Sequence, residues 1–432
     1  MTRLIAAMAL AALLAGAAAA GPSGQRVLVL LNDADAMRTS HARFLADLEG
    51  RGYSLDVRAI DDSSLQLKRW DEWLYDKAVV LGSAKALGGA IDAAQLVDFV
   101  DAGHDLFLAV DGGASEELRS LALDLGVDVD ARGNSVIDHF AYDSRLGGED
   151  HATVLARDAV QSAVVLPGGL TGPVLFRGVG LSVPAESETA FLALSASPTA
   201  YAGKPGSAMT EAKLAGTSLG LVALAQLRNN ARVAVTGSLW MLSDTAYGAE
   251  ATGREGKSLG RAGNEGLVAA VSRWAFQERG VLRASNLSHR VVAGGHPGVV
   301  RPERYRINDD VEFSVQLHEC ADGECRPFKA NDVQVELVML DPYVRATLQH
   351  DGQGRFAAQV KVPDTYGVFK WVVDYRRLGY SYVELTETVP IRPFKHHEYE
   401  RFIVQAYPYY ASVASMMAGF LAVGAFFLYT KA

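Results

Sequence analysis

Apolar residues in the first part of the chain follow two patterns. Mostly apolar runs predict strands at residues 26–31, 54–60, 77–81 and 105–110. Apolar residues spaced along one face predict helices between and after them, at residues 39–51, 92–101 and 115–125. Strands alternating with helices in this way predict an α/β N-terminal domain, with a parallel sheet covered on both faces.

The same pattern returns further along the chain. Residues 219–227 and 232–236 are predicted to be adjacent strands joined by the turn Arg228-Asn229-Asn230-Ala231, and residues 264–277 a strongly amphipathic helix. The α/β domain is expected to occupy residues 21–283. Residues 150–215 are rich in Gly, Pro, Ser and Ala, and their pattern predicts neither helices nor strands.

From residue 284 the pattern changes to alternating apolar and polar positions. Strands are predicted at residues 310–317, 332–340, 356–362, 367–375 and 381–389, separated by turn sequences such as Asp341-Pro342 and Asp351-Gly352. Since no helical pattern intervenes, residues 284–405 are expected to form a β-sandwich domain.

Both ends of the chain differ from the middle. Residues 1–20 combine Arg3, an apolar stretch and Ala18-Ala19-Ala20, the pattern of a cleaved signal peptide. Residues 406–430 contain no charged side chain and have tyrosines near both ends, so they are predicted to form one transmembrane helix. This predicts a single-pass type I membrane protein, with its bulk in the lumen and residues 431–432 in the cytosol.

The charge of the chain argues against one class of partner. A net charge of -9 over 432 residues argues against nucleic acid as a partner.

The two cysteines, Cys320 and Cys325, flank the turn Asp322-Gly323, and a disulfide between them is feasible in an oxidising compartment. Asn286 begins the sequon Asn286-Leu287-Ser288 and is a candidate N-glycosylation site.

Candidate catalytic groups are few. Asp33, Asp35, Asp111 and the pair Asp138-His139 lie near strand ends or in loops, where α/β enzymes place their sites, but Asp also favours turns and no nucleophile accompanies them. The sequence Gly216–Gly220 fits the G-x-S-x-G elbow of serine hydrolases, yet a strand is predicted after its serine rather than before it. We therefore expect no catalytic residue, no cofactor and no metal ligand.

The predicted membrane helix has a face of small side chains. Ala411, Ser415 and Gly419 recur every fourth residue and so share one face, where another helix can approach closely. No side chain of the span is ionisable, which argues against proton or ion transport through it. The spacing predicts a helix-packing face.

Several long, ordered stretches of the chain resemble one known family. They begin at Phe176 (F-R-G-V-G), Arg228 (R-N-N-A-R-V), Ser272 (S-R-W), Glu278 (E-x-G-V-L-R), Pro363 (P-D-x-Y-G-V-F), Asp374 (D-Y-x-R-L-G-Y), Tyr399 (Y-E-R-F-I) and Ala406 (A-Y-P-Y-Y-A-S). Over nearly the whole mature chain the sequence resembles the 48 kDa subunits of the endoplasmic-reticulum oligosaccharyltransferase.

The resemblance implies a non-catalytic subunit of that complex, which transfers a glycan from dolichyl diphosphate to Asn of N-x-S/T sequons. It implies an N-terminal domain similar to glutamine-amidotransferase-like folds without their active site. It further implies residence in the endoplasmic-reticulum membrane and assembly with other subunits, including the polytopic catalytic subunit, in contact with membrane lipid.

Two other functions stay open at this stage. A self-sufficient lumenal hydrolase or transferase would use Asp33, Asp111 or Asp138-His139. A lumenal or surface receptor for glycans or glycated proteins would need only a binding surface.

Overall fold

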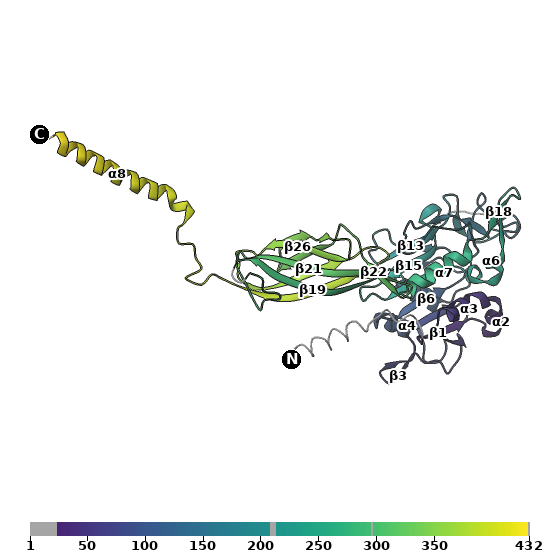
Figure 1. Ribbon diagram of the computed structural model, residues 1–432. Helices are drawn as coiled ribbons and strands as arrows, with labels where there is room; N and C mark the ends of the chain where they lie inside the picture. The colour runs from purple at the N-terminus through teal and green to yellow at the C-terminus, as the bar shows by residue number, and fades with distance from the viewer. Residues whose placement is uncertain (1–23, 208–212, 295–296, 431–432) are drawn as a thin grey trace.

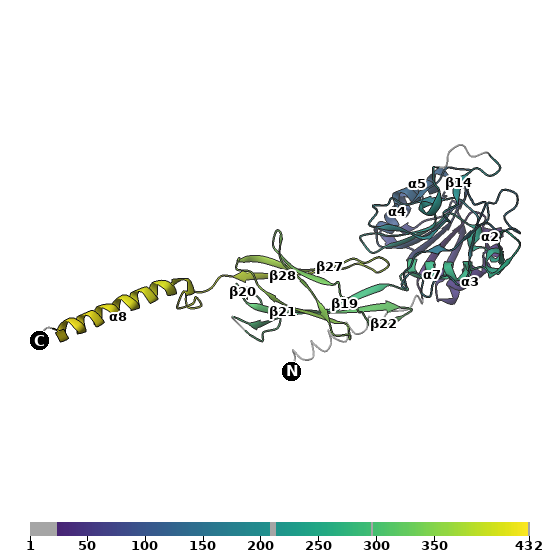
Figure 2. The same ribbon diagram turned by 90° about the horizontal axis from the view of Figure 1, so that it is seen from above.

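The computed structural model describes residues 24–207, 213–294 and 297–430. It consists of three parts in a row: an α/β region, a β-rich region and one long helix, α8 (Tyr407–Thr430) (Figure 1). The same order is visible from a second direction (Figure 2). The predicted signal peptide and the predicted cytosolic residues 431–432 lie outside the described residues.

A mixed sheet of ten strands forms the centre of the α/β region. Five neighbouring strands are parallel, in the order β2 (Ser54–Ala59), β1 (Arg26–Leu31), β5 (Lys77–Leu81), β6 (Asp105–Ala109) and β16 (Arg232–Thr236). The sheet continues antiparallel through β15 (Gly220–Gln226), β13 (Ala190–Ser195) and β10 (Asp158–Ala159). The prediction of a parallel sheet is wrong for this side. The turn 227–231 is too short for a parallel crossover, so it returns the chain antiparallel.

Helices cover both faces of this sheet. On one face, α4 (Ala93–Asp101) and α5 (Glu116–Asp124) bury Leu96 and Leu121. On the other, α3 (Ala42–Gly50) and α7 (Asn264–Ala275) bury Phe44 and Trp274. The predicted helices are confirmed to within two residues at each end, except that residues 39–51 are divided: α2 (Ala34–Ser40) ends at His41 before α3 begins.

The segment without a predicted element contains strands of two to six residues, too short for a readable period. These strands are β9 (Val154–Ala156), β10, β11 (Val174–Phe176), β12 (Leu181–Ser182), β13 and β14 (Tyr201–Gly203). The other short elements of the α/β region are β3 (Lys68–Arg69), β4 (Glu72–Trp73), β7 (Asp128–Val129), β8 (Ser135–Ile137), η1 (Gly216–Ser218), η2 (Trp240–Leu242), α6 (Asp244–Gly248), β17 (Glu250–Thr252) and β18 (Ser258–Arg261).

Two five-stranded sheets make up the β-rich region. One contains β19 (Val281–Ala293), β21 (Asp310–Ala321), β22 (Glu324–Pro327), β25 (Gln349–His350) and β26 (Arg355–Lys361). The other contains β20 (Tyr305–Arg306), β23 (Gln334–Val338), β24 (Pro342–Thr347), β27 (Gly367–Tyr375) and β28 (Val383–Arg392). Phe313 and Phe356 of the first sheet share one core with Phe369 and Trp371 of the second. All five predicted strands are present; β19, with only three buried residues among its thirteen, was missed.

The chain leaves the β-rich region through residues 393–406, which include the short turn η3 (Val404–Ala406), and enters α8. Among the described residues, Val404–Thr430 is the one helical segment long and apolar enough to cross a membrane. Its 24-residue helix is roughly 36 Å long at 1.5 Å per residue.

Candidate functional site at the domain junction

The strand-end carboxylates, where an α/β enzyme would place its site, hold loops in position. The Asp33 side chain accepts a hydrogen bond from the Ala36 N–H and caps α2, in whose first turn Asp35 lies. One Asp111 oxygen accepts hydrogen bonds from Ser83 Oγ at 2.6 Å and from the Gly113 N–H at 2.9 Å. Both Asp33 and Asp111 therefore have structural roles.

Asp138 and His139 belong to separate contact networks. Asp138 is fully buried and accepts hydrogen bonds from Ser197, Thr199 and two backbone N–H groups. Burial alone would raise the Asp138 pKa, but these hydrogen bonds outweigh it and hold the pKa below its usual value. His139 is exposed and contacts His151 at 2.7 Å and the Tyr201 hydroxyl at 3.0 Å.

The serine of the G-x-S-x-G match lies in a different local structure from a nucleophile elbow. Residues Gly216–Ser218 form a single 3-10 turn before β15, and Ser218 Oγ donates to the carbonyl of Ala215 at 2.9 Å. An elbow requires a strand before the serine and a helix after it. Within the described part of the chain, no group of three or more His, Cys, Asp or Glu side chains is arranged to hold a metal ion.

A cleft of about 750 Å³ lies at the amino ends of the parallel strands, on the side of the sheet away from Asp33 and Asp111. There the α/β region meets the β-rich region. Lys77 and Asp105, which begin β5 and β6, line it together with the turn Asp322-Gly323. Ligand sites of open α/β sheets lie at the carboxyl ends of the strands, whereas this cleft lies at their amino ends. Its position indicates a structural junction rather than a catalytic centre.

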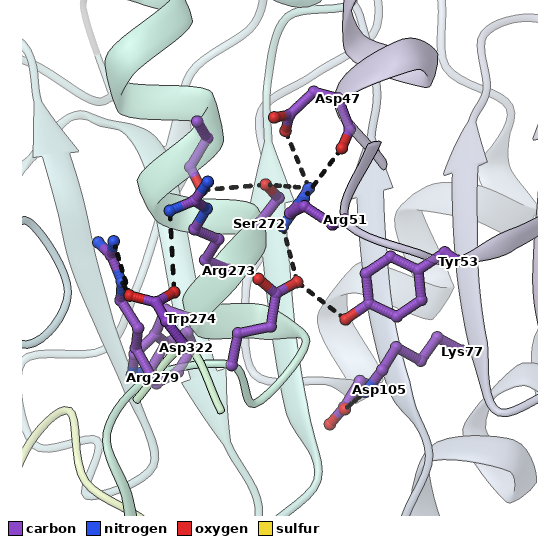
Figure 3. Close-up of polar contacts among 12 residues, drawn as sticks. Asp47, Arg51, Tyr53, Lys77, Asp105, Ser272, Arg273, Trp274, Arg279 and Asp322 are labelled. Atoms are coloured by element: carbon purple, nitrogen blue, oxygen red, sulfur yellow. Dashed lines mark hydrogen bonds and ion pairs between the residues drawn. The ribbon is translucent and has the colours of Figure 1, made fainter. Parts of the chain in front are cut away.

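A network of polar side chains forms one wall of the cleft (Figure 3). The nearly buried Arg51 contacts Glu278 at 2.8 Å, Ser272 at 3.0 Å and Asp47 at 3.1 Å. Tyr53 donates to the same Glu278 oxygen at 2.8 Å. Burial, followed by the negative charge of Glu278, raises the Tyr53 pKa, so the phenol remains a donor. This network fixes α3 to the segment that follows α7.

A second pair of buried charges lies beside it. Lys77 Nζ contacts Asp105 Oδ2 at 2.6 Å, with both side chains less than a tenth exposed (Figure 3). The other Asp105 oxygen accepts from the Arg232 N–H at 3.0 Å and from Gln277 at 2.9 Å. Asp105 thus joins β5, β6, β16 and the segment after α7, and both of its carboxylate oxygens accept hydrogen bonds.

Arg232 is completely buried at the start of β16. Its guanidinium donates to the carbonyl oxygens of Trp274 at 3.0 Å, Arg279 at 2.6 Å and Gly280 at 2.8 Å, and lies 4.7 Å from the Trp274 ring centroid. Burial lowers the Arg232 pKa to about 10, so the group remains charged at neutral pH. The side chain binds the last turn of α7 and the segment that enters the β-rich region.

Hydrogen bonds connect the two regions directly. Asn230, with φ of 69°, both donates to and accepts from the backbone of Tyr382, at 3.1 and 2.6 Å. Trp274 Nε1 donates to the Gly379 carbonyl at 2.8 Å, and Gln226 donates to the Tyr380 carbonyl at 2.8 Å. The loop between β27 and β28 is therefore fixed to β15, β16 and α7.

The hairpin of β21 and β22 makes a further contact across the junction. Cys320 and Cys325 form a disulfide that closes this hairpin. Asp322 at its tip lies 3.3 Å from Arg279 and 3.8 Å from Arg273, and its N–H donates to the Glu278 carbonyl at 2.8 Å (Figure 3). The disulfide thus holds the turn that presents Asp322 to the α/β region.

Four of the stretches that carry the family resemblance meet at this junction: R-N-N-A-R-V, S-R-W, E-x-G-V-L-R and D-Y-x-R-L-G-Y. Sequence reasoning did not identify it as a site. One sequence feature could have indicated the junction: Arg232 is a charged residue within an apolar strand, and a buried charge needs buried partners.

The other sequence-predicted residues lie apart from the junction. Asn286 is exposed at an irregularity of β19, and its side chain donates to Gln316 at 2.6 Å. Ala411, Ser415 and Gly419 lie on α8 and are exposed, as is almost all of that helix.

Two family models match this chain: "OST48, N-terminal domain" over residues 18–278 and "OST48 middle domain" over residues 290–431. The chain is 41% identical to the dolichyl-diphosphooligosaccharide–protein glycosyltransferase 48 kDa subunit of Arabidopsis thaliana. This match covers 95% of this chain and 94% of that protein. It is 38% identical to the Caenorhabditis elegans protein of that name and 36% identical to the Danio rerio protein, covering 94% of this chain and 92% of each.

Among solved structures, a ThuA-like protein from Parabacteroides merdae matches 58% of this chain and 89% of its own, at 12% identity and a TM-score of 0.33. That likeness is too distant to assign a fold. The sequence matches cover both regions and α8. The chain belongs to the family of 48 kDa subunits of the dolichyl-diphosphooligosaccharide–protein glycosyltransferase.

Proposed function

We propose that this chain is a non-catalytic subunit of the oligosaccharyltransferase complex. That complex transfers a preassembled glycan from dolichyl diphosphate to Asn of N-x-S/T sequons in the lumen of the endoplasmic reticulum. The observation that carries the proposal is the similarity to 48 kDa subunits over 94–95% of the chain. The strand-end carboxylates Asp33, Asp111 and Asp138 have structural roles, which supports a non-catalytic role for this chain within the complex.

The proposed domain organisation has five parts. Residues 1–20 are a signal peptide, 21–283 a lumenal α/β domain of glutamine-amidotransferase-like type, 284–405 a lumenal β-sandwich, 406–430 the membrane span and 431–432 a cytosolic tail. The apolar helix α8 supports the span. The Cys320–Cys325 disulfide and the exposed Asn286 sequon support a lumenal position for the body of the chain.

The function follows from the junction and the span together. The junction holds the two lumenal domains in a defined arrangement, and α8 offers Ala411, Ser415 and Gly419 to a neighbouring helix. The partners are the other subunits, including the polytopic catalytic subunit, with membrane lipid around α8. The chain therefore acts in the assembly and stability of the complex.

Affinity purification of the full chain in mild detergent tests this function. We expect the polytopic catalytic subunit and other subunits to co-elute with the tagged chain, and not with an unrelated tagged single-span protein. Recovery of the chain alone would overturn the proposal.

Protease treatment of sealed microsomes tests the orientation, since a lumenal body is protected until the membrane is opened.

A further inference from the structure

Four large apolar side chains are exposed at one end of the β-rich region. Leu340 is 91% exposed, Tyr366 67%, Val368 60% and Tyr343 44%. Leu340 lies in the turn between β23 and β24, and Tyr343 is the second residue of β24. Tyr366 directly precedes β27, of which Val368 is the second residue. Apolar side chains gathered in this way at a surface indicate contact with another apolar phase.

Strand register places these residues beside the exit of the chain towards α8. Val338, at the end of β23, pairs with Lys370 of β27, and Gly367 pairs with Ile391 near the end of β28. The chain then leaves β28 for α8. Figures 1 and 2 both show that the end of the β-rich region away from the α/β region leads to α8.

The connection to α8 is short, and its first part is held close to this end. Arg392 contacts both Glu398 oxygens, at 2.6 and 2.8 Å, and Arg306 lies 5.1 Å from the Phe394 ring centroid. Even fully extended, residues 393–406 reach at most roughly 50 Å, and these contacts shorten that reach. Residues close to α8 are also apolar and exposed: Phe402, Ile403 and Val404.

We propose that this end of the β-rich region rests in the headgroup layer of the bilayer that α8 crosses, with Leu340, Tyr343, Tyr366 and Val368 inserted. The inference rests on the proposed function, because it requires α8 to span the membrane. Tyrosine is suited to this layer, since its ring is apolar and its hydroxyl polar. The exposed Lys370 follows Tyr366 and Val368 on the same face of β27 and can extend its ammonium towards the headgroups.

Labelling of single cysteines in the full chain tests this contact, since the two native cysteines are joined in a disulfide. Leu340→Cys and Tyr366→Cys are labelled with an environment-sensitive fluorophore and reconstituted in phosphatidylcholine vesicles, with and without spin-labelled lipid. Phe420→Cys on α8 is the positive control. Leu123→Cys on α5, 58% exposed in the α/β region, is the matched negative control.

We expect spin-labelled lipid to quench Leu340→Cys, Tyr366→Cys and Phe420→Cys, and to leave Leu123→Cys unchanged, in vesicles and in the reconstituted complex alike. Quenching at Phe420 without quenching at Leu340 and Tyr366 overturns this inference and leaves the span intact. Quenching in vesicles that is lost in the complex also overturns it, because a protein partner then covers the patch. Absence of quenching at Phe420 overturns the proposed span itself.

Discussion

Arg232 is a fully buried charged residue at the start of an otherwise apolar strand. Its guanidinium donates to the carbonyl groups of Trp274, Arg279 and Gly280, which lie more than forty positions away in the sequence. A buried guanidinium is tolerated only when its donors are satisfied, so these contacts must form together.

Replacing Arg232 should destabilise the fold strongly. Arg232→Met removes the charged donor and leaves three carbonyl groups without it, which should lower the free energy of unfolding by about 3 kcal/mol or more. Chemical unfolding of the full chain in detergent measures this. Arg228→Met, at an exposed position of the turn that precedes β16, should change stability little. Equal stability of the two variants would contradict the role given to Arg232.

We expect His289 to make the stability of the β-rich region sensitive to pH. It is 2% exposed and lies 2.6 Å from the Tyr305 hydroxyl and 3.3 Å from Glu387. Burial lowers the His289 pKa below 6.5, although Glu387 opposes this shift. The unfolded chain therefore binds the proton more readily than the folded chain, and stability present above pH 6.5 is lost as the pH falls through the folded-state pKa.

We expect the thermal unfolding midpoint of the wild type to decrease as the pH is lowered from 7. His289→Gln should show a smaller decrease. Thermal unfolding of both proteins in a pH series measures it. A wild-type midpoint that stays constant or rises as the pH falls would show that His289 is not held neutral.

At the scale of elements, the sequence predicted the helices that have a regular apolar face. The ranges 92–101 and 115–125 were predicted for α4 and α5, and their first residues, Asp92 and Ser115, are the N-caps of these helices in the structure. The strand β19 was missed because its side chains are mostly exposed or half-buried. The antiparallel side of the sheet could have been predicted from the short turn 227–231, but the short strands of residues 150–215 could not, since they have no periodicity.

The β21–β22 hairpin should depend on its disulfide. The double variant Cys320→Ser, Cys325→Ser removes a cross-link over a short loop, which in the chain-entropy account lowers stability by about 2 kcal/mol. Because the hairpin presents Asp322 to Arg273 and Arg279, hydrogen exchange at the Asp322 N–H should become faster. Unchanged exchange there would show that the hairpin holds its position without the cross-link.

The helix α8 should meet a partner through its small side chains. Gly419→Leu fills the face shared with Ala411 and Ser415 and should reduce the recovery of other subunits in mild detergent. Gly424→Leu is the matched control, since nine residues at 100° each place Gly424 opposite Ser415. If both variants retain the other subunits equally well, the small-residue face is not a contact.

At the scale of the whole molecule, the junction explains how two regions with separate cores form one body. Asn230, Trp274 and Gln226 bind the loop between β27 and β28, while Asp322 binds the α/β region from the other side. The sequence predicted two regions and a span, but not this junction. Its contacts join residues far apart in the chain, so no local pattern contains them.

Asn230→Gly should loosen the junction without unfolding either region, because it removes both contacts with the Tyr382 backbone while glycine tolerates the φ of 69°. Limited proteolysis should then cut the loop between β27 and β28 faster than in the wild type. Asn331→Ala, which loses a contact to His350 elsewhere, is the control. Equal cutting rates would indicate that other contacts alone hold the loop.

The most direct test of the account is the occupancy of N-x-S/T sequons in secreted proteins after depletion of this chain, measured by mass spectrometry. We expect occupancy to fall, and to be restored by the wild-type chain and by Asp35→Asn or His139→Gln, since exposed groups of the α/β region have no catalytic part. Normal occupancy after complete depletion, or variants that assemble but fail to restore it, would contradict a non-catalytic subunit role.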